Sequence, residues 1–415
     1  MIGRLLARAT GLSERQARLI ALLGLGAFGS AWAVTTITTY LPPLLRRYTS
    51  SNTLIGLVLA IESGFALLLP LAVGPWSDRV RTRFGSRRPF MLAGLFPLTA
   101  GLALVAFVPG LLPIALVLAL FFVGVYLFES PYRGLYSDLL RRNVFGRSQG
   151  AQHVFRGVAI GGALVAGGFL LAVWRPLPFL VSAGIVAASF GVLLVEVHEP
   201  ATRRGAAGGI RELLATPLRI VARNQAVRRY LIANSVWEGS FAGLRSFVVL
   251  DITRGLHQPS SVASLALACV AAGYLLAALG ASRFGDRFGL ARVIFAASLV
   301  YGAGLSLAVL AGRWHAWYYA LTVFVAVAGG TVMTLGGGLL YKIMPGHDRG
   351  AVVGLATSSR AVGLLLGPLA VGGAIDVARP FLHATAGYAA MWPTIGIPIL
   401  LVSPLLLLLA RAEAA

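Results

Sequence analysis

The sequence predicts an all-α membrane protein whose twelve transmembrane helices form two six-helix halves related by pseudo-symmetry. Three observations support this fold class. The composition is strongly apolar, apolar stretches of about 20 residues recur along the chain, and the two halves of the sequence resemble each other. Together these observations exclude a soluble globular domain.

The composition is that of a membrane protein. Of the 415 residues, 58% are hydrophobic and only 12% are charged, whereas a soluble domain carries about 25% charged residues. The formal net charge of +21 would suit a nucleic-acid-binding protein, but the basic residues are dispersed over short connections between apolar stretches. We therefore expect membrane lipids around the chain and no nucleic acid as a partner.

Twelve stretches are apolar and long enough to cross a bilayer. They cover residues 18–41, 53–74, 90–108, 113–137, 150–173, 177–197, 229–251, 260–281, 291–311, 316–338, 350–373 and 388–410. Glycine and proline occur inside them, which membrane helices tolerate because neighbouring helices satisfy freed backbone groups.

Arginine placement predicts the orientation. The N-terminus and the connections after even-numbered stretches hold most of the arginines, and cytoplasmic connections carry an excess of basic residues. We therefore expect both termini to be cytoplasmic. Lys342 is the single lysine, a bias typical of a high-GC genome, and we expect a bacterial cytoplasmic membrane.

The chain then divides into three parts. Residues 1–198 form the first six-helix half, residues 199–228 a central cytoplasmic loop, and residues 229–415 the second half. Inside the loop, the stretch GIRELLATPLRIVARN is typical of an amphipathic helix on the membrane surface. We expect the protein to be a monomer.

The two halves share a weak internal repeat. The segment that begins GPWSDR at Gly74 recurs as ASRFGDRFGLAR, which places Asp286 and Arg287 opposite Asp78 and Arg79. A second pair of matching segments places Arg156 opposite Arg360. Two parallel six-span repeats resemble the plan of the major facilitator superfamily, in which the substrate binds midway through the membrane between the halves.

The connection between the second and third stretches is similar to the signature loop of that superfamily. The resemblance implies that Asp78 lies at the N-terminal end of a helix in the opposite half, where the helix dipole favours a carboxylate. It also implies that the arginines pair with a carboxylate such as Asp138 and latch the cytoplasmic side shut. The alternative is that the arginines only set the orientation of the chain. The expected gate residues are Gly74, Asp78, Arg79, Arg87, Arg88, Asp138, Asp286 and Arg287.

Two motifs narrow the resemblance. LPLAVGPWSDRVRTRFGSRRPFML (69–92) and PYRGLYSDL (131–139) resemble segments of plant-type sucrose–proton symporters. Residues 129–132 match a D-x-P-F motif of melibiose-type carriers. Both groups are glycoside–pentoside–hexuronide cation symporters. The resemblance implies proton-coupled symport of a sugar or glycoside by alternating access.

Ionisable residues inside the spans are the candidates for proton coupling. Each costs at least about 2.5–3.5 kcal/mol at the centre of the bilayer, so those present are functional candidates by default. Glu129 and Arg133 are four residues apart and can pair on one helical face, either structurally or as a coupling pair. Glu62 and Glu129 are the candidate partners of Arg156. The expected coupling residues are Glu129, Glu62, Arg133, Arg156 and His153.

The seventh stretch carries the candidate substrate face. Asn234, Glu238, Phe241 and Arg245 follow one helical face beside Trp237, and a sugar site combines polar groups with an aromatic ring. The alternative is a Glu238–Arg245 pair that locks the helix. The first stretch adds a hydroxyl-rich stripe suited to a wet cavity. The expected substrate residues are Trp32, Thr36, Tyr40, Asn234, Trp237, Glu238, Arg245 and Arg360.

The motifs of several other classes of protein are missing from the sequence. It contains no G-x-x-x-x-G-K-[ST] phosphate loop and no HExxH motif, so we expect no enzyme activity, no cofactor and no metal site. One carboxylate per helix favours protons over sodium, which needs several oxygen ligands. The alternatives to sugar import are a proton-coupled exporter of amphipathic metabolites or drugs and a non-transporting sensor.

Overall fold

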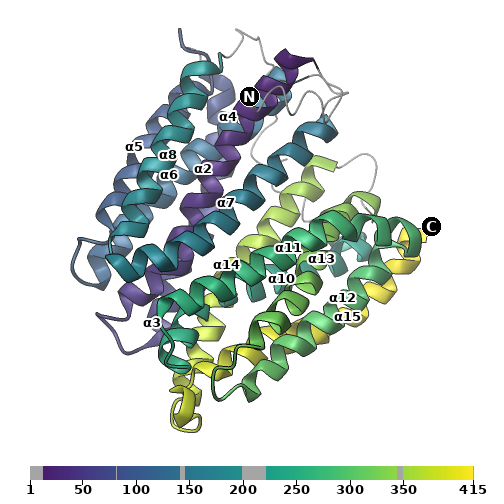
Figure 1. Cartoon of the computed structure of the whole chain (residues 1–415). Coiled ribbons are helices and arrows are strands. Elements are labelled where there is room, and N and C mark those ends of the chain that lie inside the picture. The colour runs from purple at the N-terminus through teal and green to yellow at the C-terminus, as the bar shows by residue number, and fades with distance from the viewer. Residues whose placement is uncertain (1–12, 81, 141–144, 199–220, 344–348, 415) are drawn as a thin grey trace. The chain divides into compact units, whose positions relative to one another are not determined.

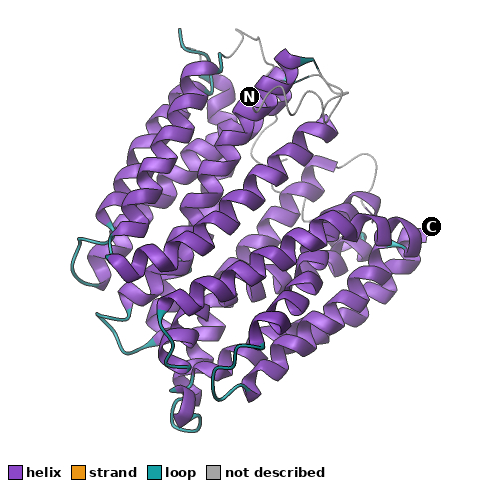
Figure 2. Ribbon diagram, in the orientation of Figure 1, coloured by secondary structure: helices purple, strands orange, loops and turns teal. Residues whose placement is uncertain are grey.

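The computed structural model describes residues 13–80, 82–140, 145–198, 221–343 and 349–414 (Figure 1). Figure 2 shows helices and loops throughout this part of the chain. The amphipathic helix predicted in the central loop falls outside the described residues except for the helical residues 221–223.

A helix coincides with each of the twelve predicted spans. The helices are α2 (Glu14–Leu45), α3 (Asn52–Leu59), α4 (Ile61–Arg79), α5 (Arg88–Leu104), α6 (Leu111–Leu139), α7 (Phe145–Val173), α8 (Leu177–Glu196), α10 (Gln225–Leu250), α11 (Ser260–Phe288), α12 (Leu290–Leu307), α13 (Tyr318–Ile343), α14 (Arg349–Ala378) and α15 (Met391–Ala414). Within the described residues, ten helical segments are long and apolar enough to cross a membrane. Helix α5 is shorter, and the polar residues of α10 lower its hydropathy.

The second predicted span is broken into two helices. Helix α3 ends at Leu59 and α4 begins at Ile61. The hydroxyl of Ser63 donates a hydrogen bond of 2.6 Å to the carbonyl of Ala60 at the break. The break places Glu62 in the first turn of α4, where the helix dipole favours a carboxylate.

The chain forms two compact units that differ from the two halves of the sequence. Unit 1 comprises Met1–Leu41 and Phe65–Ala207, and unit 2 comprises Pro42–Gly64 and Gly208–Ala415. Residues 42–64, which include α3 and the start of α4, therefore group with the second half. Symmetry of the sequence alone assigns them to the first half.

In unit 1, α5 packs against α6 and α8. The phenol of Tyr132 on α6 donates a hydrogen bond of 2.5 Å to the carbonyl of Leu23 on α2, and its ring lies where a Cβ on Gly26 would be. A small residue on α2 thus gives α6 close access.

In unit 2, α10 packs against α14 and α15, α11 against α13, α12 against α15, and α3 against α14. Glycines on both helices allow the backbones of α10 and α14 to approach closely. A Cβ on Gly367 would lie 2.0 Å from the carbonyl oxygen of Gly239. The two backbones nearly touch, and this brings the polar side chains of both helices together.

Candidate functional site

The candidate site is a polar line along α10. Its members are Asn234, Glu238 and Arg245, which lie on one face of the helix at i, i+4 and i+11. Helix α10 starts at an N-cap, where the side chain of Asn224 accepts a hydrogen bond of 3.0 Å from the backbone N–H of Val227. The partners of these three side chains all belong to unit 2.

Two members of the line bond to α14. The carboxylate of Glu238 lies 3.4 Å from Nε of Arg360, with 22% and 29% of the two side chains exposed. The amide of Asn234 donates to the hydroxyl of Ser359 at 2.8 Å and to the carbonyl of Ala356 at 3.3 Å. This end of the line is polar, partly open and rich in both donors and acceptors.

The third member forms the most buried ion pair of the line. Nη2 of Arg245 lies 2.9 Å from Oε2 of Glu62, and only 13% and 4% of the two side chains are exposed. The pair joins α10 to the first turn of α4. Nε of Arg245 is buried and has no hydrogen-bond partner among the described residues, and the ring of Phe241 lies 6.0 Å from its guanidinium.

These pairs answer two questions that the sequence left open. The alternative Glu238–Arg245 pair does not form, because Glu238 bonds to Arg360 and Arg245 bonds to Glu62. Glu62 was also one of the two expected partners of Arg156. In the structure, Glu62 pairs with Arg245 instead. Arg156 lies on α7 and is half-buried.

Trp237, the expected stacking partner of a sugar, lies beside the polar line and is buried in this structure. Its side chain is 1% exposed. It lies beside Gly336 of α13 and meets the ring of Tyr230 edge-on at 6.2 Å. One residue along a helix turns the side chain by about 100°, so Trp237 packs α10 on α13 while Glu238 faces α14.

The hydroxyl stripe of α2, expected to line a wet cavity, makes packing contacts inside unit 1 in this structure. Nε1 of Trp32 donates to the hydroxyl of Ser182 at 3.0 Å, and Thr36 shares a hydrogen bond of 2.8 Å with the same hydroxyl. The phenol of Tyr40 donates to the carbonyl of Leu164. Thr36 and Tyr40 are buried. The stripe therefore holds α2 against α8 and α7.

Glu129 and Arg133 form the pair that their spacing predicts. Nη2 of Arg133 lies 2.5 Å from Oε1 of Glu129, with 51% and 14% of the side chains exposed. Both residues belong to α6, so this pair bridges successive turns of one helix. The side chain of His153 falls outside the described residues.

Two arginines of the expected gate, Arg87 and Arg88, form hydrogen bonds inside unit 1. Arg87 is buried, and its Nη1 donates to the carbonyl of Pro131 at 3.3 Å. A Cβ on Gly134 would lie 1.3 Å from Nη1 of Arg87, so the guanidinium fills the space that this glycine leaves on α6. Arg88 donates to the carbonyl of Leu194 on α8.

The rest of the gate is only partly described. The side chains at positions 74, 78, 79 and 138 fall outside the described residues, so the latch through Asp78 and Asp138 stays a prediction. Asp286 and Arg287 are exposed near the end of α11. The guanidinium of Arg287 lies 5.1 Å from the ring centroid of Phe288.

Sequence reasoning missed Asp376, near the end of α14. Its carboxylate accepts five hydrogen bonds from the start of α3. The donors are the backbone N–H groups of Asn52 and Thr53 and the side chains of Ser51, Asn52 and Thr53, each at 2.9 Å. The run Ser51-Asn52-Thr53 is a helix-start signal, but no local pattern links it to a residue more than 300 positions away.

No metal centre stands out in the described part of the chain, where no group of three or more His, Cys, Asp or Glu side chains could hold a metal ion. The chemistry that these side chains offer is proton exchange at carboxylates and hydrogen bonding to a polar ligand.

The comparisons with known proteins decide the family. The sequence profile of the Major Facilitator Superfamily matches residues 23–250 and 239–415. The chain belongs to the Major Facilitator Superfamily. It is therefore an integral membrane protein and a secondary transporter, and not an enzyme.

Solved transporter structures share the fold of this superfamily member. A bacterial homolog of the human lysosomal transporter Spinster covers 96% of this chain and 97% of its own, with a TM-score of 0.76 and 16% sequence identity. The nucleoside transporter NupG covers 94% and 98%, with a TM-score of 0.75 and 14% identity. Identities this low show the fold alone.

Two curated relatives match parts of this superfamily member. Solute carrier family 45 member 3 of Homo sapiens is 32% identical over 173 residues, which is 39% of this chain and 30% of the relative. Proton-associated sugar transporter A of Homo sapiens is 34% identical over 91 residues, 22% of this chain and 12% of the relative. The matched stretches thus span less than a third of either relative.

Proposed function

We propose that this chain is a proton-coupled symporter that carries a sugar or glycoside across a bacterial cytoplasmic membrane by alternating access, with both termini cytoplasmic. The buried Glu62–Arg245 pair carries this proposal. The partial similarity to a protein named proton-associated sugar transporter A supports the choice of a proton as the coupling ion and of a sugar as the substrate.

The Glu62–Arg245 pair suits proton coupling because it links two helices. Protonation of Glu62 would remove the partner of a buried guanidinium, and a buried charge without a partner is strongly destabilising. Proton binding would therefore favour a different arrangement of α4 and α10. In the Glu129–Arg133 pair the arginine side chain is 51% exposed, so water can solvate it when Glu129 is protonated, and we assign this pair the secondary role.

The Glu238–Arg360 pair suits the substrate. It is longer than the Glu62–Arg245 pair and its side chains are more exposed. A sugar hydroxyl can donate to a carboxylate and accept from a guanidinium or an amide. The Glu238–Arg360 ion pair and the hydrogen bonds of Asn234 to α14 would thus be exchanged for hydrogen bonds to the sugar.

The test is uptake of labelled sugars into vesicles that contain only the purified protein and lipid. With the vesicle interior more alkaline than the outside, we expect at least one disaccharide or glycoside to accumulate. A protonophore should abolish that accumulation. Glu238→Gln keeps the shape of the side chain and removes its charge, so it should weaken uptake without loss of the folded protein.

Failure across a broad panel of sugars, with folded protein, would contradict the sugar assignment. The alternative is then a proton-coupled exporter of amphipathic metabolites or drugs. That function predicts raised resistance when the protein is expressed in a host that lacks its own drug pumps.

A further inference from the structure

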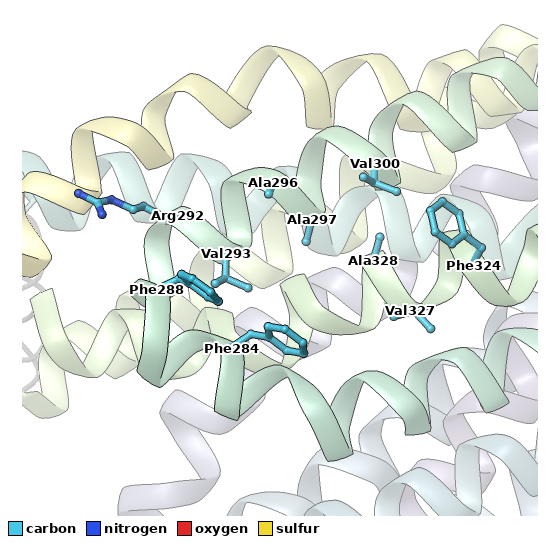
Figure 3. Close-up of a pocket in the computed structure, with 10 residues that line it drawn as sticks. All are labelled: Phe284, Phe288, Arg292, Val293, Ala296, Ala297, Val300, Phe324, Val327 and Ala328. Carbon is cyan, nitrogen blue, oxygen red and sulfur yellow. The ribbon is translucent and has the colours of Figure 1, made fainter.

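Unit 2 has a groove on its outer surface between α11, α12 and α13, with a volume of about 470 Å³ (Figure 3). Such a volume lies within the range of about 300–1,000 Å³ that is typical of ligand pockets. Small side chains, Ala296, Ala297 and Ala328, form part of its lining. Phe284, Phe288 and Phe324 are exposed beside them.

The chemistry of the groove is almost wholly apolar. Nine of its ten lining residues are phenylalanine, valine or alanine, and the tenth is Arg292. Figure 3 shows Arg292 at one end of the groove and Phe324 toward the other. Water needs polar partners to occupy a cavity, which this lining does not offer along its length. A hydrocarbon chain is the complementary occupant.

The arginine end of the groove is positively charged. Gly289, at a φ of +88°, makes the tight turn between α11 and α12, so the end of α11 lies close to the first turn of α12. Arg283, Arg287 and Arg292 are exposed there with one acidic side chain, Asp286. Among the described residues, no carboxylate lies within ion-pair distance of Arg292.

We propose that this groove binds an anionic phospholipid, with one acyl chain along the apolar lining and the phosphate at Arg292. Basic residues beside membrane helices attract anionic headgroups, and the arginine bias of the sequence predicts that Arg283, Arg287 and Arg292 lie on the cytoplasmic side. The occupant needs both an acyl chain and a negative charge, because the groove offers complementary surface for each. This site is separate from the polar line of α10 and does not depend on the transported substrate.

Native mass spectrometry of the full chain tests the proposal. The protein in detergent is mixed with equal amounts of phosphatidylglycerol and phosphatidylcholine that carry the same acyl chains. We expect phosphatidylglycerol to be retained preferentially. Arg292→Gln should lower that retention about fivefold, since one basic residue near an anionic membrane contributes about 1 kcal/mol. Arg292→Lys keeps the charge and should retain the lipid.

Matched controls separate the site from general effects. Arg283→Gln removes an exposed charge from the same region but outside the groove lining, and should change retention less than Arg292→Gln. Ala297→Phe fills the groove and should lower retention of both lipids, whereas Leu307→Phe, at an exposed position of α12 outside the lining, should not. Circular dichroism verifies helix content, and Ala297→Leu replaces Ala297→Phe if that variant is misfolded.

Two results would overturn the proposal. One is equal retention of phosphatidylglycerol and phosphatidylcholine by the wild-type protein. The other is unchanged retention of both lipids in folded Ala297→Phe or Ala297→Leu. Neither result bears on sugar transport, so the two proposals fail independently.

Discussion

The side chain of Glu62 is 4% exposed, and its carboxylate is paired with the guanidinium of Arg245. Breaking a buried ion pair by removal of one partner costs about 3–5 kcal/mol. We therefore predict that Glu62→Gln and Arg245→Gln each lower the thermal unfolding midpoint of the detergent-solubilised protein strongly. The double substitution should cost less than the sum of the two. Additive effects would show that the two side chains do not interact.

The partly open Glu238–Arg360 pair leads to a different prediction. Hydrogen bonds to charged groups contribute about 1.5–3 kcal/mol, so Glu238→Gln should raise the KM for the transported sugar by about tenfold or more. Trp237→Phe should leave KM unchanged and reduce stability instead, because that ring lies in the core. Initial rates of labelled sugar uptake measure both effects. A larger KM effect for Trp237→Phe than for Glu238→Gln would reverse the assignment.

Side-chain pairing could be predicted from the sequence only where it is local. The spacing of Glu129 and Arg133 fixes their relative position on one helix, and the structure forms that pair. The Glu62–Arg245 pair joins residues 183 positions apart. Rules based on helical spacing cannot predict a pair that is so distant in sequence. The packing of Trp237 against Gly336 of α13 is likewise a contact between distant parts of the sequence.

At the scale of elements, Asp376 holds the start of α3 on α14. It accepts five hydrogen bonds from residues 51–53. We predict that Asp376→Ala lowers the free energy of unfolding by about 2–4 kcal/mol, because several hydrogen bonds to a charged carboxylate are lost together and each contributes about 1.5–3 kcal/mol. Asp376→Asn keeps one acceptor and should have an intermediate effect. Thermal unfolding in detergent measures both, and an unchanged midpoint for Asp376→Ala would contradict this role.

The close approach of α10 to α14 gives a second prediction for elements. A Cβ on Gly367 would lie 2.0 Å from the backbone oxygen of Gly239, and backbone cannot move aside as a side chain can. Gly367→Ala should therefore destabilise the protein by about 1–3 kcal/mol or more. Gly373 lies on the same helix with nothing within 4 Å of its Cβ position. Gly373→Ala should be neutral or slightly stabilising, since alanine favours helix, and equal effects of the two substitutions would refute the account.

The helices themselves were largely predictable, since long apolar stretches define them. The break at Ala60 was not predictable, because alanine favours a helix and carries no helix-stop signal. Helix α10 shows the opposite case. The polar residues that make it a candidate site are the ones that weaken its transmembrane signal.

At the scale of the whole molecule, the sequence repeat and the compact units disagree about residues 42–64. The repeat places them in the first half, whereas their contacts place them in unit 2. The Asp376 bonds and the Glu62–Arg245 pair are among the contacts that hold them there.

The superfamily could be recognised from the repeat and the signature loop, and the family profile confirms it. The substrate could not be inferred from sequence motifs in the same way. It depends on a few side chains, such as Glu238 and Arg360, that meet only in the folded chain.

Coupling of proton and sugar at Glu62 is the central proposal, and one measurement tests it most directly. The purified protein is placed in vesicles that contain a pH-sensitive dye, and sugars are added outside one at a time. We predict that one sugar acidifies the interior of wild-type vesicles, that Glu62→Gln abolishes the acidification, and that Glu129→Gln retains it in part. Acidification that persists in Glu62→Gln, or is lost only in Glu129→Gln, would contradict the account.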